Sequence, residues 1–256
     1  MPSSRSRLCG AVISPEDLSG EETERLFSLY AAHYDAADRG RFLADLADKD
    51  HVILLRDAET GLTRGFSTQK ILRTEIDGRP VRALFSGDTI VDRSYWGEQE
   101  LVRAWGRYAG RLLVSEPTPL WWLLISKGHR TYLYLPLFFK NYWPRFDAPV
   151  PDEARRLRHE LASAKFGAAW DPMAGVLRFE ESLGQLKPAL AEVPPGRRDD
   201  PRVQFFLESN PGYARGEELV CLAEITPKNL RSIGLRAVSE GMAEGALAPA
   251  AACSIS

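Results

Sequence analysis

The stretch from Arg82 to Ser115 constrains the fold more than any other part of the chain, because it reads as a strand, a short turn and a long helix in succession. Apolar and partly β-branched residues are typical of a buried strand, and here they are Val81, Leu84, Phe85, Ile90 and Val91. Gly87 lies among them, and a glycine inside a strand indicates a bulge or a close backbone approach. The helix has one apolar face, formed by Leu101, Trp105, Tyr108 and Leu112.

The turn between this strand and this helix contains Trp96 and Gly97. A helix that begins directly after a strand presents unpaired backbone N–H groups and a partial positive charge, which favour an anionic ligand. The turn is therefore a candidate phosphate site. The alternative is an ordinary connection between a strand and a helix in an α/β core, and the stretch alone leaves both open.

The residues before this stretch predict a strand, two helices and an antiparallel meander. Residues 8–13 form the first strand, and Ser19 and Glu22 have the spacing of a capping box that begins a helix. A second helical pattern covers residues 38–48. Residues 51–57 and 65–76 read as strands, and Asp77-Gly78 then gives a strong hairpin signal.

After the central helix, residues 120–126 are continuously apolar and predict a strand buried on both faces. A strand, a helix and a strand need a crossover connection, so this strand should lie parallel beside residues 81–91. We expect the two strands to splay apart at their C-terminal ends and leave a cleft. Residues 130–143 read as an aromatic-rich helix that Pro136 kinks or ends early.

The remaining residues are less regular. We predict a helix at 153–166, a strand or the start of a helix at 176–181, and a proline-rich charged loop at 190–202. A short helix, a turn and a strand follow up to residue 225. The Ala-, Gly- and Ser-rich tail from about residue 240 is expected to be frayed.

Composition excludes several classes of function. The chain is 44% hydrophobic and 27% charged with a formal net charge of -2, which does not favour bulk electrostatic binding of nucleic acid or membrane. Three distant cysteines and isolated histidines indicate no metal site. No signal peptide and no membrane span is expected, so a cytoplasmic location is the prediction. The common hydrolase, nucleotide and zinc motifs are absent from the sequence.

The order of these elements over residues 8–145 resembles the GCN5-related N-acetyltransferase (GNAT) superfamily. The resemblance implies an α/β fold with a mixed, mostly antiparallel central sheet flanked by helices. Residues 1–150 would be the acyl-donor-binding core, and residues 151–256 a C-terminal extension that completes the sheet. It also implies an acyltransferase that moves an acyl group from a coenzyme A (CoA) or acyl-carrier-protein thioester to a small-molecule amine by direct transfer, with no tightly bound cofactor.

The family binds the donor's pyrophosphate at a turn of the form Arg/Gln-x-x-Gly-x-Gly/Ala. Here Ser94 stands at the first position, Gly97 keeps the middle glycine, and Gln99 replaces the last small residue. These departures resemble branches that use acyl-carrier protein, such as N-acyl amino acid synthases and acyl-homoserine-lactone synthases. By resemblance, the donor-binding residues are Val91, Arg93, Trp96, Gly97 and Gln99.

Three residues are candidates for catalysis: Asp88, Tyr134 and His129. With the alternation of a strand, Asp88 and Asp92 should point to the same face as Ser86 and Ile90. A carboxylate on a half-buried strand must be paired or hydrogen-bonded. Asp88 could hold or deprotonate an amine, or could simply bond to a turn.

Tyr132 and Tyr134 lie close to where the resembled family keeps a tyrosine near the thiolate leaving group, so Tyr134 is a candidate acid and core packing is the alternative. His129 is a candidate base or a surface or capping residue, and the lysine beside it should lower its pKa.

Arg103, Arg107 and Arg111 form a basic ridge at helical spacing that could meet an acidic carrier protein or simply be solvated. The abundant aromatic residues could fill the core or line an acyl tunnel. We therefore expect an N-acyltransferase. A non-catalytic GNAT-like binding or regulatory module is the alternative, and an enzyme of another fold is a third.

Overall fold

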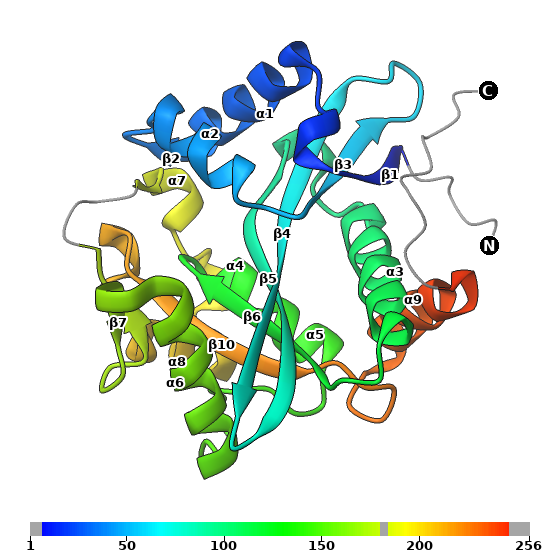
Figure 1. The fold of residues 1–256 in the computed structure, drawn as a ribbon. Helices are drawn as coiled ribbons and strands as arrows, with labels where there is room; N and C mark the ends of the chain where they lie inside the picture. Colours follow the sequence, from blue (N-terminus) through cyan, green and yellow to red (C-terminus); the bar gives the residue numbers. More distant parts are fainter. Residues whose placement is uncertain (1–6, 180–183, 246–256) are drawn as a thin grey trace.

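The computed structural model describes residues 7–179 and 184–245. Its centre is an eight-stranded sheet in the order β1-β3-β4-β5-β6-β10-β8-β7 (Figure 1). The strands, in sheet order, are β1 (Leu8–Ile13), β3 (His51–Asp57), β4 (Thr63–Ile76), β5 (Arg79–Val91), β6 (Leu120–Ser126), β10 (Glu218–Glu224), β8 (Val176–Leu177) and β7 (Trp170–Asp171). Only β5 and β6 pair in parallel; the other neighbours are antiparallel. The predicted α/β class with a mixed, mostly antiparallel sheet is confirmed.

Helices cover both faces of this sheet. They are α1 (Gly20–His33), α2 (Arg39–Ala47), α3 (Glu100–Ser115), α4 (His129–Tyr132), α5 (Tyr134–Phe138), α6 (Asp152–Phe166), α7 (Pro188–Ala191), α8 (Pro201–Ser209) and α9 (Ser232–Glu244). One apolar cluster packs α3, α5, α8 and α9 on the first face of the sheet. On the second face, one cluster packs α1 and α2, and another packs α6. The second face is therefore covered by two separate groups of helices.

Short elements complete the structure. Strands β2 (Tyr34–Asp35) and β9 (Gln185–Leu186) form a small antiparallel pair outside the main sheet. The 3-10 helices are η1 (Pro15–Asp17), η2 (Arg93–Tyr95), η3 (Gly167–Ala169), η4 (Pro195–Arg197) and η5 (Tyr213–Arg215). The β2–β9 pair ties the segment before α7 to the end of α1.

Local sequence signals explain several boundaries. Ser19 and Glu22 form the predicted capping box at the start of α1. Asp77 and Gly78 both have positive φ, 52° and 73°, as a two-residue hairpin turn of this type requires, and they join β4 to β5. The predicted strands and helices of residues 8–126 are confirmed.

Two regions after β6 differ from the prediction. The helix expected at 130–143, with a kink or an early end at Pro136, is the two short helices α4 and α5, and it ends early, since the chain is extended from Phe139 onward. Phe139 and Trp143 make backbone bridges to Leu230 and Leu222, so tertiary pairing outweighs the helical pattern there. Helix α9 was not predicted and runs to Glu244, so the chain is helical at the first residues of the expected tail. Residues 246–256 lie outside the described ranges.

Strands β5 and β6 diverge as predicted. Their parallel register runs from Arg82 opposite Leu120 to Ser86 opposite Leu124, whereas β5 continues to Val91. Figure 1 shows β6 turning away from β5 beyond this point. The backbone of residues 87–91 therefore has no partner on its β6 side, and an opening through the sheet is left between the two strands.

Candidate active site

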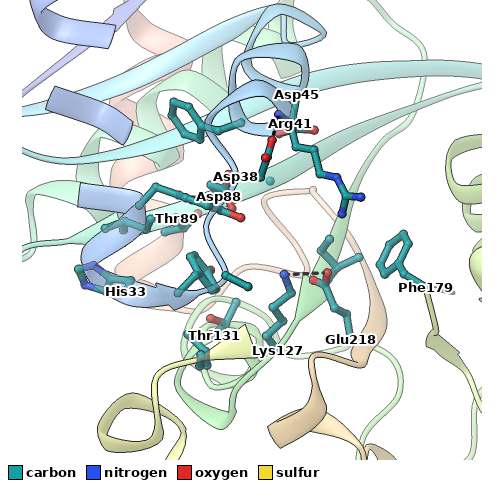
Figure 2. A pocket seen from close by; sticks show the side chains of 18 of the residues that line it. His33, Asp38, Arg41, Asp45, Asp88, Thr89, Lys127, Thr131, Phe179 and Glu218 are labelled. Atoms are coloured by element: carbon teal, nitrogen blue, oxygen red, sulfur yellow. Dashed lines mark hydrogen bonds and ion pairs between the residues drawn. The ribbon is translucent and has the colours of Figure 1, made fainter. Parts of the chain in front are cut away.

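Two cavities meet at the opening between β5 and β6. The larger has a volume of about 450 Å³ and lies on the second face of the sheet, between the α1–α2 pair and α6 (Figure 2). The smaller, of about 30 Å³, lies on the first face beneath α3 and α5. Thr89 and Thr131 line both cavities. These two threonines therefore lie between the two cavities, and this place between the splayed strands is here named the passage.

A β-bulge places Asp88 in the larger cavity. The β4–β5 register shifts so that Ser67 faces Thr89 but Gln69 faces Ser86, which confirms the bulge expected at Gly87. A Cβ at Gly87 would lie 2.6 Å from Thr68 Oγ1, so glycine allows this close approach.

The bulge also corrects one prediction. Asp88 shares a face with Ile90, as expected, but Ser86 faces the opposite side, toward α3. The extra residue of the bulge reverses the alternation between these positions.

The Asp88 carboxyl has an unusual environment. Enclosure in the cavity wall, followed by the nearby Asp45 carboxylate, raises its pKa from 3.8 to about 7, although Lys127 and Lys49 act in the opposite direction. Figure 2 shows Asp88 on β5 and Lys127, directly after β6, facing the same cavity. Asp88 can therefore both take up and release a proton near neutral pH.

Opposite Asp88, a second acid forms an ion pair. Glu218, the first residue of β10, lies 3.5 Å from Lys127 Nζ, and burial raises the pKa of Glu218. Lys49 pairs with Asp45 at 2.5 Å on the other side of the cavity. The Lys127–Glu218 pair was not predicted, because its two residues come from segments far apart in the chain.

A buried polar network shapes the smaller cavity. Trp105 and Trp122 both donate from Nε1 to Ser86 Oγ, at 3.2 and 2.9 Å. Ser86 Oγ in turn donates to Gln69 Oε1, and Gln69 Nε2 donates to Ser67 Oγ at 2.7 Å. Ser67 Oγ and Thr89 Oγ1 share a hydrogen bond of 2.7 Å, so the chain of hydrogen bonds ends at Thr89, beside the passage. Core packing is therefore the role of these tryptophans, and the cavity they border is a narrow slot rather than a wide acyl tunnel.

The two tyrosine candidates separate clearly. Tyr134 lines the slot, stacks on Phe138 with ring centres 5.9 Å apart, and has its pKa raised by burial. Tyr132 instead donates its hydroxyl to the Pro144 carbonyl at 3.0 Å, deep in the core. Of the two, Tyr134 is the one placed next to the passage.

His129 lies apart from this arrangement. It is 2% exposed at the start of α4 and lines neither cavity. Burial, followed by the charge of Arg130, lowers its pKa to about 4, so it is neutral at physiological pH. Asp92 is also separate: it accepts hydrogen bonds from the Ser94 N–H and hydroxyl and caps η2.

The turn before α3 is open on its outer side. Trp96 Nε1 donates to the Val91 carbonyl at 2.9 Å, and the Trp96 side chain is 44% exposed. Gly97 has a φ of +96°, and no heavy atom lies within 4 Å of the place where a Cβ would be. Gln99 is the N-cap of α3, and no side-chain capping hydrogen bond forms there.

Acidic residues also lie at this end of α3. Glu98 pairs with Arg7 at 2.8 Å, and Glu100 Oε1 accepts a hydrogen bond from the Gly10 N–H at 3.1 Å. On the predicted basic ridge, Arg103 pairs with Glu100 and Arg107 with Glu244 of α9. The ridge is therefore partly neutralised and flanked by α9.

The described residues offer neither a cluster of metal ligands nor a membrane-spanning helix. No group of three or more His, Cys, Asp or Glu side chains that could hold a metal ion occurs in residues 7–179 and 184–245. None of the helices in those ranges is long and apolar enough to cross a bilayer.

The chain resembles known proteins in structure and not in sequence. No protein-family model and no curated protein matches the chain. Among solved structures, 50 chains match. One from Enterococcus faecalis, named a probable N-acyltransferase, is 15% identical over 56% of this chain and 38% of that chain, with a TM-score of 0.39.

Two further structures are similar in the same way. A GNAT family N-acetyltransferase from Escherichia coli in complex with CoA is 12% identical over 50% of this chain and 67% of that chain, with a TM-score of 0.36. A ribosomal-protein-alanine N-acetyltransferase from Brucella melitensis is 18% identical over 67% of this chain and 99% of that chain, with a TM-score of 0.37. The chain has the mixed, mostly antiparallel sheet and the diverging parallel pair of strands that its element order predicted.

Proposed function

We propose that the protein is an acyltransferase that moves an acyl group from a CoA or acyl-carrier-protein thioester to an amine. One observation carries this proposal: Asp88, a carboxyl with a pKa of about 7, lines a cavity that shares Thr89 and Thr131 with a second cavity on the opposite face of the sheet. Two substrates can then approach the same point from different sides, which is the arrangement that direct transfer requires.

The larger cavity is the acceptor site in this proposal. Its volume of about 450 Å³ suits a small molecule, and the carboxylates of Asp38, Asp45 and Asp88 line it. These carboxylates attract an ammonium group, and Asp88 then takes the proton that must leave before nitrogen can attack. The sequence alone suggested this role for Asp88, and the proposal keeps it.

The slot holds the reacting end of the donor. The thioester lies at the passage between Thr89 and Thr131, and the amine nitrogen attacks its carbonyl carbon. A C–N bond forms and the C–S bond breaks. The nitrogen loses its second proton as the amide forms, and the departing thiolate takes a proton from the Tyr134 hydroxyl, whose raised pKa keeps it protonated at neutral pH. The proton from the nitrogen then passes through solvent to the Tyr134 phenolate, so that the charges and protons balance. His129 has no part in these steps.

Backbone groups stabilise the negative charge that develops on the carbonyl oxygen. Beyond Ser86, the edge of β5 that faces β6 has no strand partner, so N–H groups there are free to donate. Fixed N–H donors near a developing oxyanion are among the largest contributions to catalysis. The splay thus supplies both the opening and the donors.

The rest of the donor extends along the end of β5 and the turn before α3. Val91, Arg93, Trp96, Gly97 and Gln99 form this surface. Acyl-carrier protein is the alternative donor and partner in this proposal, and the pairing of Arg107 with Glu244 leaves less free charge on the ridge of α3 for docking.

Release of free thiol tests the proposal. We would incubate the protein with acyl-CoA or acyl-carrier protein and a mixture of small amines, and follow thiol formation and acylated products by mass spectrometry. We expect amine-dependent thiol release that rises with pH around a midpoint near 7 and is lost in Asp88→Asn. Thermal stabilisation by the donor without any product would instead support the non-catalytic binding module and contradict transfer.

A further inference from the structure

Two arginines from separate segments pack against Trp96, and the charge of a third arginine, Arg197, acts on one of them. Arg93 follows β5, Arg130 follows β6, and Arg197 lies in η4. The guanidinium carbons of Arg93 and Arg130 are each 5.3 Å from the centre of the Trp96 ring. All three arginines are exposed. The ends of the two splayed strands thus carry a cluster of positive charge, here named the arginine cluster: Arg93, Arg130 and Arg197.

One carboxylate lies near the arginine cluster: after the hydrogen bond from Arg202, the charge of Arg197 helps to lower the pKa of Asp200. In the described part of the chain, none of its three members forms an ion pair. Partial burial of Arg130 lowers its pKa, and the charges of Arg93 and Arg197 lower it further. Burial likewise lowers the pKa of His129, and the charges of Arg130 and Arg197 lower it further. Bringing like charges together costs free energy, which an anion between them would recover.

The cluster is held in position by backbone carbonyls. Arg93 Nη2 donates to the Ala189 carbonyl at 3.3 Å, and Arg130 Nη1 donates to the Leu190 carbonyl at 2.5 Å. Helix α7 supplies both carbonyls. The chain just before α7 is anchored by the pairing of β9 with β2 and by a hydrogen bond from the Lys187 N–H to the His33 carbonyl. Each guanidinium has several N–H donors in a planar fork, so further donors remain for a ligand.

The position of the cluster relates it to the donor. Arg130 directly precedes Thr131, which lines the passage where the thioester is placed. The α3 N-terminus is a poorer anion site, because Glu98 and Glu100 lie there. Arginine forks match phosphate oxygens in paired hydrogen bonds.

We propose that Arg93, Arg130 and Arg197 bind the phosphate of the donor's phosphopantetheine arm, with Trp96 packing against its chain. This inference rests on the proposed function and refines it, because Arg93 and Trp96 were expected to bind the donor, whereas Arg130 and Arg197 were not. The same phosphate occurs in CoA and in acyl-carrier protein, so the site serves either source.

Calorimetry with paired ligands tests this site. The probes are 4′-phosphopantetheine, pantetheine without the phosphate, CoA and phosphopantetheinylated carrier protein. The variant Arg130→Gln with Arg197→Gln removes two members of the cluster. The control is Arg155→Gln with Arg178→Gln, which removes the same charge from exposed arginines that pair with Asp152 and Asp171.

We expect the unmodified protein to bind 4′-phosphopantetheine at least about tenfold more tightly than pantetheine, since charge-assisted bonds to phosphate are among the strong ones. The cluster variant should lose this preference while its affinity for pantetheine stays the same, and the control should keep it. Equal losses with CoA and carrier protein support the shared phosphate; a loss with only one of them contradicts it. An unchanged preference in the cluster variant would also overturn the assignment.

Inorganic pyrophosphate separates this inference from the proposed function. If pyrophosphate and the thioester donors bind the unmodified protein and not the cluster variant, while no acyl transfer occurs, the phosphate site stands and the acyltransferase proposal fails. If donors bind and react equally well in both proteins, transfer stands and the arginine cluster is not the phosphate site.

Discussion

Replacing Asp88 by asparagine should change stability and activity in opposite directions. Enclosure raises the pKa of Asp88 from 3.8 to about 7, so between these values the folded protein binds more protons than the unfolded chain. Stability therefore falls as pH rises through this window and is constant above it. Asparagine does not ionise, so the variant escapes this loss, while transfer loses its base.

The size of the effect follows from the shift. Each pKa unit corresponds to about 1.4 kcal/mol, so the part of the window between pH 5 and pH 7 is worth at most about 3 kcal/mol. Asp88 borders a cavity that admits water, which reduces this amount. We expect the free energy of unfolding of Asp88→Asn, relative to the unmodified protein, to increase by about 1 to 3 kcal/mol between pH 5 and pH 8.

Urea unfolding at several pH values measures this difference. Asp152→Asn is the matched control, because Asp152 is 93% exposed on α6, and its difference should vary little with pH. The steady-state rate of Asp88→Asn should fall by about 100-fold or more. A stability difference for Asp88→Asn that is the same at pH 5 and pH 8 would refute the argument for a base held near neutrality.

Three further predictions concern the slot and the turn. Tyr134→Phe should lower kcat by about 100-fold with little change in KM. Tyr132→Phe should cost about 1 kcal/mol of stability and spare transfer. If kinetics and urea unfolding show the reverse pattern, Tyr134 is not the acid. Gly97→Val should weaken donor binding in calorimetry by about tenfold through steric block and backbone strain, and Gly78→Val, with a similar positive φ in the distant hairpin, should not; equal losses would point to a global effect. Ser86→Ala should destabilise the protein by about 2 kcal/mol because two buried indole N–H groups lose their acceptor, and unchanged urea unfolding would show that the network contributes little.

The core of the fold was predictable because its signals are local. The capping box at Ser19, the hairpin at Asp77-Gly78 and the bulge at Gly87 each depend on a few neighbouring residues, and all three are present. Helix α9 was missed because its reason is tertiary: Gly241 packs against the backbone of α3, where a Cβ would lie 2.0 Å from the Arg107 carbonyl oxygen. Such a contact leaves no pattern in the sequence of the helix itself.

The site was predictable only in part for the same reason. Asp88 could be named because a carboxylate on an apolar strand stands out, but its orientation depends on a one-residue bulge that reverses the alternation. The partners of the site, Lys127 with Glu218, come together only through sheet pairing between distant segments. Arg130 and Arg197 likewise converge through the path of the chain around α7, which residue spacing does not encode.

A cysteine placed at the passage tests the central claim most directly. Thr131 is half-buried and lines both cavities, so the sulfur of a bound donor should lie beside it. We would treat Thr131→Cys with the mixed disulfide of CoA and thiopyridine, and compare the unmodified protein, whose Cys221 is buried. The account predicts fast attachment of CoA at residue 131, slowed by excess free CoA but not by glutathione. Attachment at the same rate with glutathione disulfide reagents, or no protection by free CoA, would contradict a thioester site between the splayed strands.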